Sequence, residues 1–238
     1  YMNPPAKDLS KIASSDKVKK VQKDFEATHV RPERLMKTLF TDEAYVKANV
    51  DEARLMRRLF DLACNMQSHD TDMQLYSLFT DEECYDLWSC NNLYWYLTHA
   101  CSPVTDGLMP YREADLLRNI LDRADAALKE GKNQATLRFG HESCLLPLVA
   151  LLELNHYGES YPDVEKLSEQ WRAYDIFPMA SNVQFVFFHK KGSNDVLVKV
   201  LLNEKEAKLP VKTDVAPYYH WKDVESYYRE KLDKYQHI

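Results

Sequence analysis

An apolar run from Leu145 to Leu154 constrains the fold of this chain more than any other feature. It is too long for an ordinary buried strand and too short to span a membrane, so we predict a buried helix over residues 144–154. The apolar-rich segment Ala135 to Phe139 is predicted to be a short strand, and Gly140 permits a sharp turn after it. A strand that turns directly into a buried helix indicates an α/β fold.

This turn is expected to place His141 and Glu142 at the start of the helix. Pro147 fits the first helical turn, where its missing N–H costs little, and Glu142 or Ser143 would lie near the N-cap. Backbone N–H groups and the positive end of the helix dipole favour phosphate at this position. The arrangement therefore predicts phosphate chemistry. A helix cap with a salt-bridged neighbour remains the alternative for an isolated Gly-His-Glu tripeptide.

The string Phe139-Gly140-His141-Glu142 before an apolar helix resembles the C-terminal active-site motif of the histidine acid phosphatases. These form branch 2 of the histidine phosphatase superfamily, and the resemblance is to the bacterial phytase or multiple inositol polyphosphate phosphatase type. The family motif is His-Asp or His-Ala-Glu, whereas here Glu142 follows the histidine directly and Ser143 stands where the later Glu would be. Residues 171–188 and 196–204 resemble the following helix, loop and strands of the family.

The resemblance implies a helix-rich α/β fold with a large inserted helical domain, here incomplete. Residues 1–132 would be a mainly helical cap or insertion domain, and residues 133–238 the C-terminal half of the α/β phosphatase domain. It also implies hydrolysis of phosphate esters, inositol polyphosphates among them, through a phosphohistidine intermediate. Glu142 would be the proton donor and His141 would stabilise the phosphoryl group, with Ser143 and Arg138 as further substrate-binding residues.

The family also requires an Arg-His-Gly-x-Arg-x-Pro motif, which this chain lacks. None of the eight histidines follows an arginine or precedes a glycine. The attacking histidine would therefore come from an N-terminal half of the phosphatase domain, and this chain alone is predicted to be inactive. The alternative is a non-catalytic helical and α/β binding module.

A metallohydrolase is a weaker reading of the chain. His69, Asp70, Asp72 and His99 lack the spacing of a known metal site, and His69-Asp70 is predicted to be a polar loop between helices. The five cysteines show no Cys-x-x-Cys spacing, which argues against structural zinc. Disulfides among Cys64, Cys84, Cys90 and Cys101 and buried free thiols both remain open. We predict no metal and no cofactor.

Charge and composition limit the partners. The net charge of −6 argues against nucleic-acid or membrane-surface binding, and a polyanionic substrate would need arginines from a missing segment. Five glycines and no Gly-rich phosphate loop argue against nucleotide binding. The expected partner is a phosphorylated small molecule. No membrane span is predicted and residues 1–4 do not resemble a signal peptide, while the family resemblance implies a periplasmic or secreted protein.

Helical spacing and turn signals predict the remaining elements, with helix starts at Thr41-Asp-Glu and Thr80-Asp-Glu-Glu and an irregular stretch over residues 1–14. The expected helices are 16–27, 34–40, 51–66, 81–100, 112–129, 162–173 and 221–234. The expected strands after the motif are 182–190 and 195–202, joined by a turn at 191–194.

Overall fold

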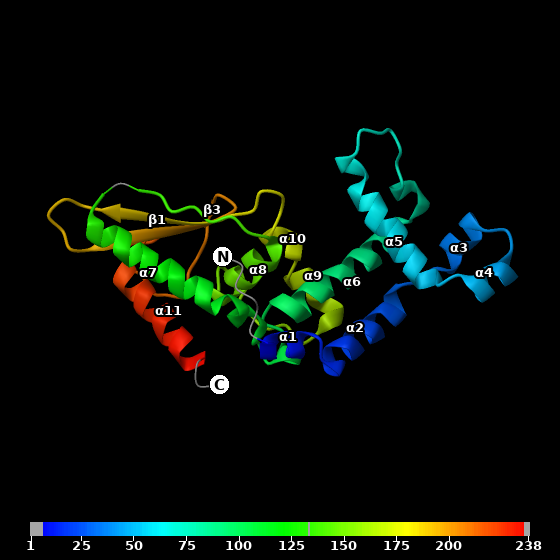
Figure 1. The fold of residues 1–238 in the computed structure, drawn as a ribbon, viewed down its shortest axis with the longest axis horizontal. Coiled ribbons are helices and arrows are strands. Elements are labelled where there is room, and N and C mark those ends of the chain that lie inside the picture. The colour runs from blue at the N-terminus through cyan, green and yellow to red at the C-terminus, as the bar shows by residue number, and fades with distance from the viewer. Residues whose placement is uncertain (1–6, 133, 236–238) are drawn as a thin grey trace. The chain divides into compact units, whose positions relative to one another are not determined.

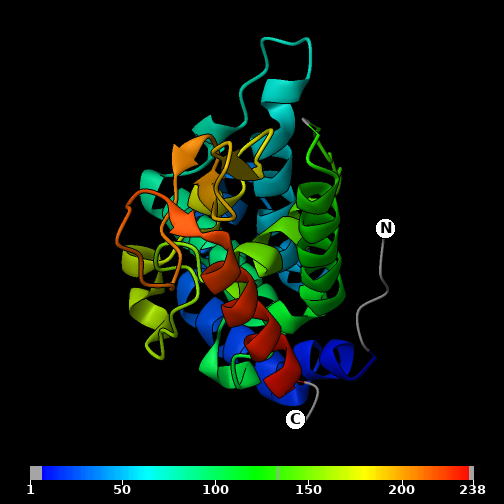
Figure 2. The same ribbon diagram turned by 90° about the vertical axis from the view of Figure 1, so that its left-hand side faces the viewer.

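The structure is a computed structural model that describes residues 7–132 and 134–235. These residues form a helix-rich α/β fold with a small antiparallel sheet (Figures 1 and 2). The α-helices are α1 (Lys7–Ala13), α2 (Asp16–His29), α3 (Glu33–Leu39), α4 (Glu43–Asn49), α5 (Glu52–Asn65), α6 (Asp81–His99), α7 (Ala114–Glu130), α8 (Glu142–Leu151), α9 (Leu167–Gln170), α10 (Ala173–Ile176) and α11 (Trp221–Tyr235). The 3-10 helices are η1 (Met66–Ser68), η2 (Tyr76–Leu78), η3 (Pro103–Thr105), η4 (Met109–Glu113) and η5 (Val164–Lys166). The strands are β1 (Val183–His189), β2 (Val196–Leu202), β3 (Lys205–Glu206) and β4 (Tyr219–His220).

The chain divides into two compact units. The helical unit is Lys19–Tyr94, and the α/β unit combines Tyr1–Val18 with Trp95–Ile238. Helices α2 and α6 each contribute residues to both units. The boundary that we expect after residue 132 concerns the domains of the complete family fold, and it stays a prediction.

The helical unit is built from short helices with well-defined caps. Asp42 accepts a hydrogen bond from the Tyr45 backbone N–H at the start of α4. Thr80 and Glu83 form a reciprocal capping box, in which the Glu83 N–H donates to the Thr80 hydroxyl at 3.2 Å and the Thr80 N–H donates to the Glu83 carboxylate at 2.9 Å. Both helix starts predicted from the sequence are thus confirmed. The apolar core of this unit consists of Val30, Leu35, Met36, Val46, Met56, Ala63, Phe79 and Leu87.

The α/β unit contains the sheet. Strands β1 and β2 form the predicted hairpin, with Val183 opposite Leu202 and His189 opposite Val196. Both β3 and β4 pair with β2 and are too short for a sequence pattern to reveal. Helix α11 packs against β2, β4 and α7, and its buried face is Trp221, Val224, Tyr228 and Leu232.

Helix α8 is fixed at its C-terminal end by α11. The Tyr228 hydroxyl donates to the Leu152 carbonyl at 2.8 Å, and the Lys231 ammonium donates to the Leu151 carbonyl at 2.7 Å. The ammonium also pairs with Glu153 at 3.1 Å. A cation here offsets the negative end of the helix dipole and satisfies a carbonyl that has no helical partner. The opposite end of α8 carries His141 and Glu142.

Several sequence predictions are wrong in detail. Residues 134–141 form no strand and run as an extended coil alongside α7 (Figure 1), because no strand of the described residues pairs with them. Residues 7–13 of the supposed irregular stretch are helix α1, while Pro4-Pro5 lies outside the described residues. The predicted helix 162–173 is divided into η5, α9 and the start of α10, since Trp171 and Arg172 adopt extended backbone.

Pro147 also lies deeper in its helix than we expected. Because α8 begins at Glu142, Pro147 falls in the second turn, inside the helix. It therefore cannot donate a backbone hydrogen bond to the Ser143 carbonyl one turn earlier. None of the helices in the described ranges combines the length and apolar character that a membrane crossing requires.

Candidate functional site

His141 is the N-cap residue of α8. Its backbone is extended, with φ −109° and ψ 164°, and its carbonyl accepts 3.0 Å hydrogen bonds from the N–H groups of Cys144 and Leu145. Its side chain is exposed and makes no capping hydrogen bond. The imidazole is therefore not committed to capping the helix. It can turn toward a ligand at the helix start.

Glu142 and Ser143 are the first two residues of α8. Glu142 is exposed and Ser143 is half-buried. The first amide groups of a helix have no carbonyl partner within the helix and, with the dipole, attract anions. The structure therefore places a histidine, a carboxylate and a hydroxyl at a helix end suited to phosphate.

Arg138 points toward α7. Its guanidinium donates a 2.8 Å hydrogen bond to the Asn119 side-chain carbonyl, and it lies close enough to Arg123 that burial and this second positive charge lower its pKa. Among the described residues neither of these two arginines has a carboxylate partner. Of the predicted site residues, His141, Glu142 and Ser143 thus lie together at the start of α8, whereas the Arg138 guanidinium is held by Asn119 of α7.

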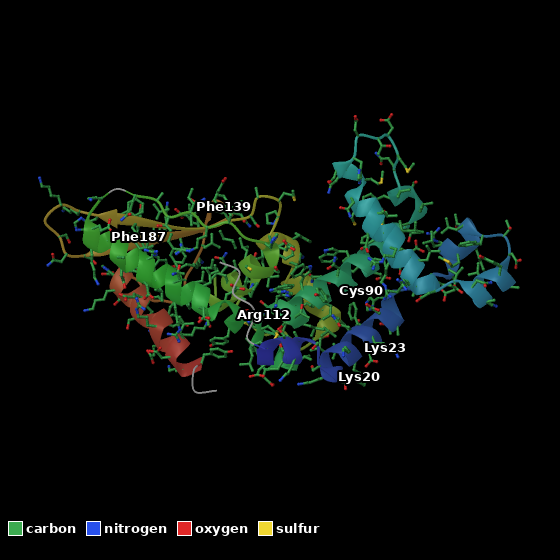
Figure 3. All side chains as sticks on the ribbon, in the orientation of Figure 1. Lys20, Lys23, Cys90, Arg112, Phe139 and Phe187 are labelled. Carbon is green, nitrogen blue, oxygen red and sulfur yellow. The ribbon has the colours of Figure 1, made fainter. Side chains whose placement is uncertain are left out.

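The segment that leads to His141 exposes large apolar side chains. Leu137 is 75% exposed and Phe139 is 92% exposed, and Figure 3 shows Phe139 on the coil between α7 and α8. Gly140, which we expected to permit a sharp turn, has no positive φ, and a side chain built there would meet nothing within 4 Å. An exposed apolar pair beside polar groups is typical of a surface that another segment covers.

Glu113 lies behind the first turn of α8, and sequence reasoning missed it. It ends η4, which packs against α8, and its half-buried carboxylate accepts a hydrogen bond from the Cys144 thiol. Burial raises the pKa of Glu113 to about 7, while neighbouring Arg112 and the thiol oppose that shift. The sequence holds no spacing signal for this contact, because Glu113 and Cys144 are joined only by tertiary packing.

The other candidate residues form no site. His69, Asp70 and Asp72 lie exposed in the loop after η1, as predicted, while His99 is buried in the α/β unit. Burial and the charge of Arg112 lower the pKa of His99 to about 4. Within the described residues no group of three or more His, Cys, Asp or Glu side chains could hold a metal ion. All five cysteines are free thiols.

Solved structures of Bifidobacterium longum multiple inositol polyphosphate phosphatase resemble this fold. The complex with inositol hexasulfate gives a TM-score of 0.72 at 18% identity, covering 94% of this chain and 58% of that chain. The complex with phosphate gives 0.65 at 19% identity, covering 94% and 55%. At such low identity the likeness shows the fold alone.

The sequence comparisons agree with the structural ones. Human multiple inositol polyphosphate phosphatase 1 is 28% identical over 134 residues, which are 51% of this chain and 27% of that protein. The chain thus spans little more than half the length of the solved relatives and matches about a quarter of the curated one. The histidine phosphatase superfamily (branch 2) matches residues 1–203. With the His-Glu pair at the start of α8 and the shared fold, this match shows that the chain belongs to branch 2 of the histidine phosphatase superfamily.

Proposed function

We propose that this chain is part of a phosphomonoesterase and supplies the phosphate-binding and proton-donating side of its active site. The observation that carries the proposal is the placement of His141 and Glu142 at the free N-terminal end of α8. Family membership supports the reaction type. Helix α8 is also a firm support, because its C-terminal end is tied to α11 while its N-terminal side chains face outward.

In this proposal the reaction proceeds through a phosphohistidine. A neutral histidine from outside this chain attacks phosphorus, and the bond from phosphorus to the leaving alkoxide breaks. Glu142 gives its proton to that alkoxide, while His141 and the α8 amides stabilise the charge on the transferring group. Water then attacks the phosphohistidine and gives a proton to the Glu142 carboxylate, the bond between phosphorus and the histidine nitrogen breaks, and phosphate leaves.

The proposed role places a requirement on Glu142. A general acid must carry its proton when the substrate binds and give it up as the leaving group departs. We therefore expect activity to be highest on the acidic side of neutrality.

The missing side of the site would be supplied by the N-terminal half of the phosphatase domain. The exposed Leu137 and Phe139 support this, because a segment lying along residues 134–140 would cover them. It would also provide the arginines that a polyanionic substrate needs, given this chain's net charge of −6. Inositol polyphosphates are the substrate class that we propose, since the relatives named above are inositol polyphosphate phosphatases. A periplasmic or secreted location fits the same proposal.

The experiment compares phosphate release from inositol hexakisphosphate and from an aryl phosphate by the full product of the reading frame. Glu142→Gln should lower turnover of the inositol phosphate by roughly 10²–10⁴-fold, the usual contribution of a general acid. The loss for the aryl ester should be smaller, because its leaving group needs no proton. His141→Ala should lower the rate of phosphate release from both substrates. Glu130→Gln, at the exposed end of α7, is the matched control.

Unchanged turnover of the inositol phosphate by Glu142→Gln would contradict the assignment of the proton donor. The alternative function, a non-catalytic binding module, predicts that the full product binds phosphate esters without releasing phosphate. Residues 1–238 tested alone should be inactive, because no histidine of this chain lies in an Arg-His-Gly motif.

A further inference from the structure

Glu113 is an acidic side chain with no role in the reaction described above, yet it touches the helix that carries the site. It is the last residue of η4 and immediately precedes α7, and it makes no capping hydrogen bond to α7. Its carboxylate instead contacts the Cys144 thiol. Cys144 follows Glu142 by two residues and lies in the same helical turn. Glu113 therefore approaches the α8 N-terminus from the buried side.

The contact lies in a well-packed part of the α/β unit. On the η4 side Met109, Pro110 and Ala114 are buried, and on the α8 side Leu146 and Pro147 are buried. Little water can therefore solvate the carboxylate, which disfavours its charged form. His141 and Glu142, in contrast, are exposed.

The charges around Glu113 define its behaviour. Arg112, from η4 itself and labelled in Figure 3, is the cation that acts on the Glu113 carboxylate. The Arg112 guanidinium donates to the Thr98 carbonyl at 3.4 Å. From α8 the Cys144 thiol donates to Glu113, with a pKa raised by burial and by the carboxylate. The elements packed against η4 carry further ionisable groups. Glu142 begins α8 and follows its N-cap His141, Asp115 lies in the first turn of α7 and is followed along that helix by Arg118, Asp122 and Arg123, and Asp8 and Lys11 of α1 pair with each other. Arg112 is thus the cation that offsets the negative charge of Glu113, and Glu113 lies beside a helix end that favours anionic ligands.

We propose that Glu113 is a positioning residue of the phosphate site that takes up a proton from water when a phosphate ester binds at the start of α8. This rests on the proposed function. An ionised Glu113 and a bound phosphate dianion would compete for the same helix end, so binding favours the neutral acid. The proton returns to water when the product leaves. Through Cys144 the neutral acid also holds the first turn of α8 in place.

Burial raises the pKa of Glu113 to about 7 even though Arg112 and the Cys144 thiol oppose it, so proton uptake by Glu113 falls in a pH range where it can be measured. Each pKa unit gained on binding makes the affinity about tenfold weaker once the pH exceeds both pKa values. The neutral acid at Glu113 accordingly favours substrate binding below neutrality.

Inositol hexasulfate tests this proposal, because its sulfates neither titrate near neutrality nor hydrolyse. Its binding to the full product of the reading frame is measured by calorimetry from pH 6 to pH 8, in two buffers of different ionisation enthalpy. For a pKa that rises by about one unit on binding, the wild type should bind about fivefold more weakly at pH 8 than at pH 6 and take up about half a proton between pH 7 and pH 8. Glu113→Gln should lose that change in affinity and the uptake, while Glu130→Gln should behave as the wild type.

Equal pH dependence in the wild type and Glu113→Gln would overturn the role of Glu113 and leave the phosphatase proposal intact. No binding of inositol hexasulfate by any variant would overturn both. If Glu113→Gln fails to fold, as judged by circular dichroism, Glu113→Asp replaces it. The shorter acid keeps the charge but withdraws from Cys144, so its binding should titrate at a lower pH, and an unaltered pH profile would refute the proposal.

Discussion

Replacing Tyr228 by phenylalanine should weaken the anchor of α8, the helix that carries the candidate site. Tyr228 is fully buried on α11, and its hydroxyl donates a 2.8 Å hydrogen bond to the carbonyl of buried Leu152. Leu152 caps the C-terminal end of α8, where carbonyl groups have no helical partner. The substitution removes one oxygen atom, keeps the ring and its packing against Tyr227, and leaves that carbonyl without a donor.

The size of the effect follows from the burial. An unsatisfied buried polar group costs about 1–3 kcal/mol. Since the carbonyl is neutral and loses no packing contacts, we expect the free energy of unfolding of the α/β unit to fall by about 2 kcal/mol. For a unit of this size the melting temperature should fall by roughly 4–8 °C.

Urea unfolding followed by tryptophan fluorescence measures the change, because Trp171 is buried in the same unit. Tyr235→Phe is the matched control on the same helix, since among the described residues nothing hydrogen-bonds to the Tyr235 hydroxyl. Its cost should stay below about 0.5 kcal/mol. Equal midpoints for Tyr228→Phe and Tyr235→Phe would refute the reasoning.

Two further predictions concern the same unit. Gly158→Ala should destabilise it by about 2 kcal/mol or more, because the new Cβ would lie 2.9 Å from the Glu153 Cα, whereas Gly140→Ala meets nothing and should be neutral by thermal unfolding. His220 lies between Asp195 and Asp214, at 3.0 and 2.9 Å, and their hydrogen bonds raise its pKa. A raised pKa gives stability that is complete below the unfolded value of about 6.5 and is lost as the pH rises through the folded value. The wild type should therefore be more stable than His220→Gln at low pH, and this difference in the free energy of unfolding should shrink as the pH rises above about 6.5. A difference in urea unfolding that stays constant with pH would contradict the prediction.

Local signals in the sequence predicted the elements that depend on local chemistry. The Thr80 capping box is formed because its two side-chain groups lie within one helical turn. The β1–β2 hairpin follows from two β-branched and aromatic runs separated by a turn at 191–194. Helix α11 was predicted almost to its ends, because its apolar residues recur at helical spacing over its whole length.

The elements that were predicted wrongly or missed depend on partners distant in the chain. Residues 135–139 have the composition of a strand, but a strand exists only where another strand supplies its hydrogen bonds. Strands β3 and β4 are two residues long and exist only because β2 lies beside them. The site shows the same division. The adjacency of His141 and Glu142 could be read from the sequence, whereas the contact of Glu113 with Cys144 arises from the packing of η4 on α8.

The exposure of His141 and Glu142 gives a physical reason to expect that turnover needs the rest of the family fold. Two opposite unit charges 4 Å apart attract by about 1 kcal/mol in water and by about 4 kcal/mol at an effective dielectric constant of 20. An exposed site attracts phosphate with an energy near the value in water. A segment lying over Leu137 and Phe139 would exclude water and bring the attraction closer to the larger value. The gain of about 3 kcal/mol for each charge contact corresponds to roughly a hundredfold in rate. In the proposed reaction such a segment would act in two ways, by excluding water and by supplying the attacking histidine, while Tyr228 and Lys231 hold α8 from its far end.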